Sequence, residues 1–157
     1  MDGPNPRSTA SIGGHPIHPM LIPFPIVCFV GALISDILFS RNGEPGWATA
    51  SNWLLGFGLG FAALAAVAGL VDFMGDDRVR RLGTALRHMI ANVSAVVVEL
   101  INLLLRLRDP AFVDNGGLIL SAIAVLILLY SGWLGGELVY RHRVGVHDRE
   151  PVPDRAP

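Results

Sequence analysis

Long apolar stretches alternate with short polar segments along most of this chain. No Asp, Glu, Lys or Arg occurs in residues 8–35, 45–71 or 115–136. A helix needs about 20 apolar residues to span the hydrocarbon core of a bilayer. The three stretches therefore predict membrane-spanning helices at about 21–39, 52–74 and 118–140.

A fourth segment, at about 84–105, is apolar on most faces but carries one polar stripe. At 100° per residue, positions separated by three and four residues share a face, and the stripe extends over about 27 Å. Lipid cannot satisfy polar side chains, so we expect this face to line the bundle interior or a water-filled path. Its polar members are His88, Asn92, Glu99, Asn102 and Arg106, with Ala95 in the same register.

Together these segments predict an all-α, polytopic membrane protein, a bundle of four transmembrane helices. Gly56 and Gly60 in the second helix form a small-x-x-x-small pair of the kind that lets membrane helices approach closely. We expect a flexible N-terminal arm at 1–14, the transmembrane domain at 15–147 and a disordered, proline-rich tail at 148–157.

Composition excludes several classes of function. Charged residues make up only 16% of the chain, against roughly 25% in soluble domains. A net charge of −1 argues against nucleic acid as a partner, and a single cysteine excludes an internal disulfide framework. We find neither a nucleophile–base constellation nor a phosphate-binding glycine loop, so the chain is not expected to be an enzyme on its own.

The arginines predict the orientation in the membrane. With four crossings, both termini lie on one side, and short loops rich in arginine stay cytoplasmic. We therefore expect both termini in the cytoplasm. That side would carry Arg7, Arg78, Arg80, Arg81, Arg87, Arg141, Arg143, Arg149 and Arg155, and the opposite side only Arg41, Arg106 and Arg108.

The five histidines fall on the same predicted side, together with two carboxylates at helix ends. Imidazoles gathered at one depth are suited to a haem or to a transition metal. The candidate ligands of a haem b are His18, His88 and His142. The candidate ligands of a metal are His15, His18, His88, His142, Asp72 and Glu137.

Two motifs resemble a known family. Residues 15–26 (HPIHPMLIPFPI) and 132–146 (GWLGGELVYRHRVGV) are similar to the end motifs of the bacterial membrane-protein family of domain of unknown function 2231, a predicted four-helix transmembrane module. Arg143 stands where the closing motif is expected to carry a glycine. The resemblance implies a bacterial inner (cytoplasmic) membrane. It also implies a redox setting, because some relatives join this module to Rieske-type or cytochrome c-type domains.

Three interpretations remain open at this point. The first is an electron-transfer module that holds haem b or a transition metal and serves a redox partner protein. The second is a non-catalytic scaffold or partner subunit in the lipid bilayer, with homo-oligomers possible, whose polar stripe only joins helices. The third is a proton or small-solute conduit through the residues of the stripe.

Overall fold

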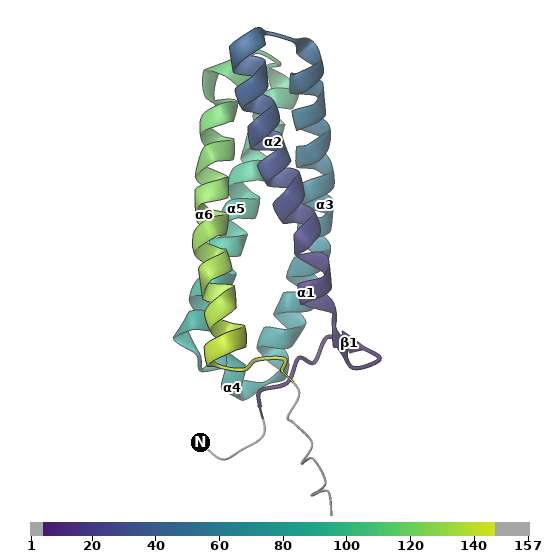
Figure 1. Ribbon diagram of the computed structural model, residues 1–157, viewed down its shortest axis with the longest axis vertical. Coiled ribbons are helices and arrows are strands. Elements are labelled where there is room, and N and C mark those ends of the chain that lie inside the picture. Colours follow the sequence, from purple (N-terminus) through teal and green to yellow (C-terminus); the bar gives the residue numbers. More distant parts are fainter. Residues whose placement is uncertain (1–4, 147–157) are drawn as a thin grey trace, which may run out of the picture.

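The computed structural model describes residues 5–146, which form a bundle of four long helices (Figure 1). The long helices are α2 (Pro23–Asn42), α3 (Pro45–Gly75), α5 (Gly83–Arg108) and α6 (Leu118–Gly136). Helix α1 (Ile17–Leu21) leads into α2, and the π-helical segments η1 (Val113–Gly117) and η2 (Glu137–Arg141) flank α6. All four helical segments are long and apolar enough to cross a membrane. The predicted all-α four-helix architecture is therefore confirmed, while the predicted tail at 148–157 lies outside the described residues.

The helices run alternately up and down and form a closed ring of neighbours. Helix α2 contacts α3 and α6, and α5 contacts the same two helices. One end of the bundle, here called the arm end, carries residues 5–16, α4 (Asp77–Arg80) and residues 142–146 (Figure 1). The opposite end, here called the far end, carries the loops 43–44 and 109–112.

Close packing between α2 and α3 centres on Gly58. A Cβ at this position would lie 2.6 Å from Cε1 of Phe29, whose ring is buried. A Cβ at Gly56 or at Gly60 would meet no atom within 4 Å, so these two glycines do not make the close helix–helix approach that their spacing predicts. Because α3 turns by 100° per residue, the glycine midway between them faces α2 instead.

Residues 5–16 are held against the end of α3. They include a two-stranded antiparallel hairpin, β1 (Ser11–Ile12) and β2 (His15–Pro16). Asp72 Oδ1 accepts hydrogen bonds from Ser8 Oγ (2.8 Å) and the Ala10 main-chain N–H (2.7 Å). The sequence predicts a flexible arm over 1–14, but these bonds tie its described part to the bundle.

Asp76 provides a second attachment for the same segment. Its Oδ2 accepts from the main-chain N–H of Arg7 (3.2 Å), and its Oδ1 accepts from the main-chain N–H of Arg78 (2.9 Å). Hydrogen bonds from the Arg78 side chain are the main reason that the pKa of Asp76 falls to about 2. The carboxylate therefore stays ionised, and able to accept these bonds, across the physiological pH range.

Candidate functional site

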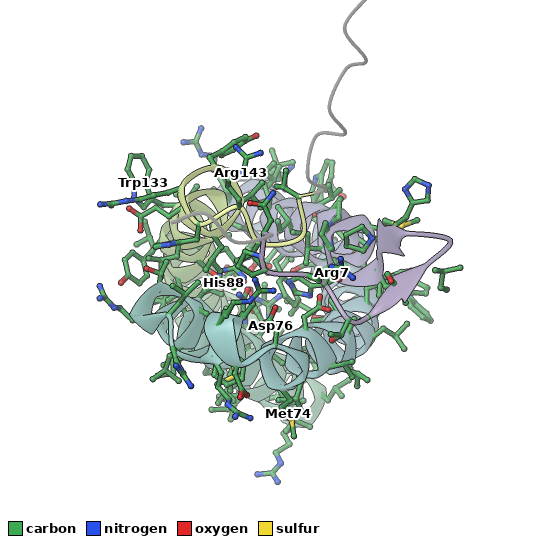
Figure 2. The ribbon with its side chains drawn as sticks, turned by 90° about the horizontal axis from the view of Figure 1, so that it is seen from below. Arg7, Met74, Asp76, His88, Trp133 and Arg143 are labelled. Carbon is green, nitrogen blue, oxygen red and sulfur yellow. The ribbon has the colours of Figure 1, made fainter. Side chains whose placement is uncertain are left out.

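Two histidines from different halves of the bundle lie close together in its interior. His18 is on α1, and its Nδ1 lies 2.8 Å from the carbonyl oxygen of Ala65 on α3. His88 is on α5, and its Nδ1 lies 2.9 Å from the carbonyl oxygen of Ser131 on α6. Viewed from the arm end, His88 lies near the middle of the bundle, whereas Trp133 and Met74 project from its edge (Figure 2).

These bonds fix which ring nitrogen carries the proton. A carbonyl oxygen can only accept, so Nδ1 of each neutral imidazole must be the N–H donor. The lone pair then lies on Nε2 in both rings. Metal-bound histidines in proteins have the same arrangement, in which one nitrogen donates to a carbonyl or carboxylate and the other binds the metal.

The distance between the two ring centres is one that two ligands of a single iron also have. Their centroids are 6.3 Å apart, and the ring planes are nearly perpendicular at 89°. A metal–imidazole bond is about 2.0–2.1 Å, and the ring centre lies about 1.1 Å behind the nitrogen, so two imidazoles on opposite sides of one metal have centres about 6.3 Å apart. An edge-to-face contact between two unligated rings falls in the same range of distances.

Asn92 completes the surroundings of His88. Its side-chain Nδ2 lies 3.1 Å from Nε2 of His88 and 2.9 Å from the main-chain oxygen of the same residue. Binding of His88 to iron through Nε2 would require Asn92 to give up the first of these bonds. The bond to the main-chain oxygen would remain, and the other amide N–H of Asn92 would lose its acceptor.

Glycines on α3 and α6 make room for both rings. A Cβ at Gly69 would lie 3.0 Å from Nδ1 of His18, and a Cβ at Gly135 would lie 3.2 Å from Cε1 of His88. Each imidazole therefore rests directly on the backbone of a neighbouring helix. Gly135 belongs to the closing motif of the sequence, although its spacing there did not indicate this contact.

A second polar cluster lies closer to the far end. Arg106 and Asp36 form an ion pair at 2.6 Å with both side chains fully buried. Ser51 on α3 accepts from Arg106 at 2.8 Å, and Ser121 on α6 donates to Asp36 at 2.7 Å. All four long helices thus contribute to one network, which Asn102 and Glu99 extend along α5.

The polar stripe predicted on 84–105 is therefore divided between two clusters. His88 and Asn92 belong to the histidine cluster, and Glu99 and Asn102 belong to the ion-pair cluster. Between them the same face carries Ala95, which is completely buried.

The ion pair was not expected from the sequence. From the sequence, Asp36 at the end of the first helix could cap that helix, pair with Arg41 or reach water, and Arg106 counts among the charges of the far side. Both are 1% exposed instead. The available signal was that an acid near the end of one apolar helix and a base near the end of another fall at the same depth.

The other predicted ligands lie apart from the histidine pair. His15 is exposed on β2. Asp72 is bonded to residues of the arm, while Glu137 forms a 3.6 Å ion pair with Arg141. His142 follows η2, where its main-chain N–H donates to the Glu137 carbonyl. Within residues 5–146, no three His, Cys, Asp or Glu side chains are grouped so as to hold a metal ion.

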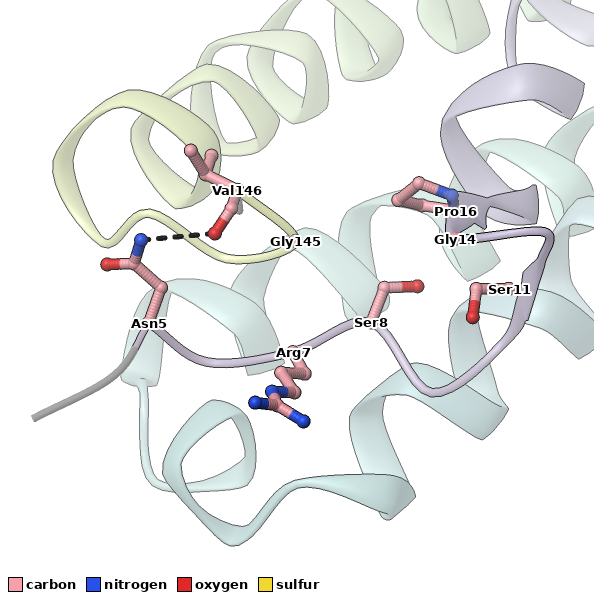
Figure 3. Close-up of a pocket in the computed structure, with 8 residues that line it drawn as sticks. All are labelled: Asn5, Arg7, Ser8, Ser11, Gly14, Pro16, Gly145 and Val146. Atoms are coloured by element: carbon pink, nitrogen blue, oxygen red, sulfur yellow. Dashed lines mark hydrogen bonds between the residues drawn. The ribbon is translucent and has the colours of Figure 1, made fainter. Parts of the chain in front are cut away.

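An open cavity of about 430 Å³ lies at the arm end (Figure 3). One wall is the segment that includes Arg7 and Ser8, and the opposite wall is formed by Gly145 and Val146. Asn5 joins the two walls through a 3.0 Å hydrogen bond to the Val146 carbonyl. No histidine is among the residues that line this cavity in the described part of the chain.

Comparison with known proteins gives one match. The family model described as a predicted membrane protein, domain of unknown function 2231, matches residues 14–148. No curated protein and no solved structure matches the chain.

Proposed function

We propose that this chain, which belongs to the predicted membrane-protein family of domain of unknown function 2231, is a membrane module that binds one haem b between His18 and His88. The observation that carries the proposal is the 6.3 Å spacing of the two imidazoles. The hydrogen bond from each Nδ1 to a main-chain carbonyl supports it, because this bond leaves Nε2 as the ligand nitrogen.

The two ligands would join the two halves of the bundle. His18 is held by the α1–α3 side, and His88 by the α5–α6 side. The carbonyls of Ala65 and Ser131 orient the rings and raise the basicity of Nε2. A haem bound in this way supplies one-electron transfer, so the module would pass electrons within the membrane to or from a redox partner protein.

A visible absorption spectrum of the purified protein tests this proposal. The chain is expressed with added haem precursor and iron, extracted in detergent, and measured oxidised and after dithionite reduction. We expect a Soret band that shifts on reduction and is lost in both His18→Ala and His88→Ala. The matched controls are His15→Ala and His142→Ala, which remove histidines outside the pair and should leave the spectrum unchanged.

Other outcomes would contradict the proposal. A colourless protein, or a band that survives both substitutions in the pair, would exclude haem binding at this place. Stoichiometric metal without haem, found by elemental analysis of the same sample, would favour a histidine-bound transition metal. A protein with neither group but a normal fold would favour the scaffold, for which the network across all four helices is the supporting observation.

A further inference from the structure

Glu99 has an unusual environment for a carboxyl group inside a membrane helix. It lies on α5 with 0% of its surface exposed. Its Oε2 accepts one hydrogen bond, from Asn102 Nδ2 at 2.9 Å. Its Oε1 is buried and has no hydrogen-bond partner among the described residues.

Every N–H group of the nearby Arg106 guanidinium already donates a hydrogen bond to a residue other than Glu99. A guanidinium has five N–H groups, and Arg106 makes five hydrogen bonds. Nε donates to Asn102 Oδ1 at 2.8 Å. The other four bonds go to the two oxygens of Asp36 and to the hydroxyls of Ser51 and Ser121. No N–H of Arg106 remains for Glu99.

The charges of the cluster balance only if Glu99 is neutral. The buried charged side chains in the described part of the chain are Asp36 on α2 and Glu99 and Arg106 on α5. Helices α3 and α6 contribute the uncharged hydroxyls of Ser51 and Ser121. The charge of Arg106 is matched by Asp36, with which it forms a pair of parallel bonds.

An ionised Glu99 would therefore carry an unmatched charge with a single amide donor. An isolated carboxylate is very costly in an apolar interior, and such a group gains a proton instead. Asn102 cannot compensate, because its two amide hydrogens already face three acceptors: Glu99 Oε2, Ser121 Oγ and the Gly117 carbonyl.

We propose that Glu99 is a proton-binding site in the membrane interior, whose carboxyl carries a proton at neutral pH. The ligand is a hydrogen ion bound by the carboxyl, and its release would leave a negative charge one amide group away from Arg106. Asn102 forms this link, since its Oδ1 accepts from Arg106 and its Nδ2 donates to Glu99. Proton binding at Glu99 would thus be coupled to the ion pair that joins the four helices.

This site is separate from the histidine pair and does not depend on haem. Glu99 lies eleven positions after His88 on the same helix, a rise of about 16 Å, with the buried Ala95 between them. Ionisable groups at such depth in membrane helices commonly mark proton relays.

Infrared spectroscopy of the protein in lipid nanodiscs tests the proposal directly. A protonated carboxyl group gives a carbonyl-stretch band that an ionised carboxylate lacks, and this band shifts in D₂O. We expect the band in the wild-type protein at neutral pH and its loss in Glu99→Gln. Glu137→Gln removes a carboxyl group at the arm end, paired with Arg141, and serves as the control.

Two outcomes of the infrared experiment would overturn the proposal. One is absence of the carbonyl-stretch band from the wild-type protein, and the other is persistence of that band in Glu99→Gln. Thermal unfolding provides a second measurement, because glutamine has the shape of a neutral glutamic acid. Glu99→Gln should unfold at the wild-type temperature or above, whereas a marked loss of stability would show that the protein uses the negative charge.

Discussion

His88 has space beside its ring because the residue of α6 that it contacts, Gly135, is a glycine. A Cβ at Gly135 would lie 3.2 Å from Cε1 of the imidazole, whereas a Cβ at Gly136 would meet no atom within 4 Å. Gly135→Ala should therefore push the ring away from the Ser131 carbonyl that orients it. Since disturbing such an orienting contact typically costs about 10–100-fold in affinity, we expect the affinity of the proposed site for haem to fall at least about tenfold.

The measurement is a haem titration of the two alanine variants, followed at the Soret band. Gly136→Ala makes the same substitution at the next residue of α6, where the added Cβ meets no atom within 4 Å, and this variant should bind haem as the wild-type protein does. Equal affinity of the two variants would show that the ring position next to Gly135 does not matter for binding.

The sequence predicted the positions of some residues of the candidate site but not the contacts between residues of different helices. The periodicity of α5 was enough to predict that His88 and Glu99 share one face, since helix geometry fixes angles along a single element. It could not pair Asp36 with Arg106, because 70 positions separate them and only the packing of both α2 and α5 against α3 and α6 brings them together. For the same reason, the sequence left open which second histidine approaches His88.

At the scale of helices, α2 and α3 are joined where a glycine lies against an aromatic ring. A Cβ at Gly58 would lie 2.6 Å from Cε1 of Phe29 and 3.0 Å from Cβ of Cys28. The ring is 1% exposed and has little space into which to move. We expect Gly58→Ala to lower the free energy of unfolding by about 1–3 kcal/mol through overpacking.

Gly60→Ala on the same helix is the matched control, because its Cβ meets nothing within 4 Å. It should be neutral, or stabilising by up to about 1 kcal/mol, since alanine favours helix over glycine. Unfolding in mixed micelles with increasing denaturing detergent would give both values. A Gly58→Ala protein as stable as Gly60→Ala would mean that the two helices can separate slightly without cost.

The small-residue pattern predicted close packing on this helix, and the buried pair is Gly58-x-x-x-Ala62 rather than Gly56-x-x-x-Gly60. The motif Gly56-x-x-x-Gly60 marks one face, while Gly58 is turned by about 200° from either end of that motif. A helix rich in small residues offers several such faces, and the sequence does not say which one meets a neighbour. The bulky partner, Phe29, is what selects Gly58 in the structure.

For the whole molecule, the uncharged apolar stretches predicted three of the four long helices, and the helical periodicity of the polar stripe predicted the fourth. Backbone groups must be satisfied within each segment in lipid, so long apolar stretches have almost no alternative to helices. The ends were less predictable: α3 begins at Pro45 and α5 ends at Arg108, both beyond the predicted limits. Docking of the arm was missed because it depends on Asp72 accepting from residues more than 60 positions away.

The distribution of arginines over the folded molecule predicts its orientation. The burial of Arg106 with Asp36 removes one charge from the far end, which leaves Arg41 and Arg108 there among the described residues. The positive-inside rule then favours the arm end as cytoplasmic more strongly than the sequence count did. The described arginines of the arm end are Arg7, Arg78, Arg80, Arg81, Arg87, Arg141 and Arg143.

Cysteine labelling in intact cells measures this orientation. The single cysteine, Cys28, lies within α2, so Cys28→Ser gives a background without thiols. In that background Asp109→Cys, exposed at the far end, should react with a membrane-impermeant maleimide added outside the cells. Asp77→Cys, exposed on α4 at the arm end, should react only after lysis. The reverse pattern would contradict a cytoplasmic arm end, and labelling of both sites from outside would contradict an arrangement in which α5 crosses the membrane between them.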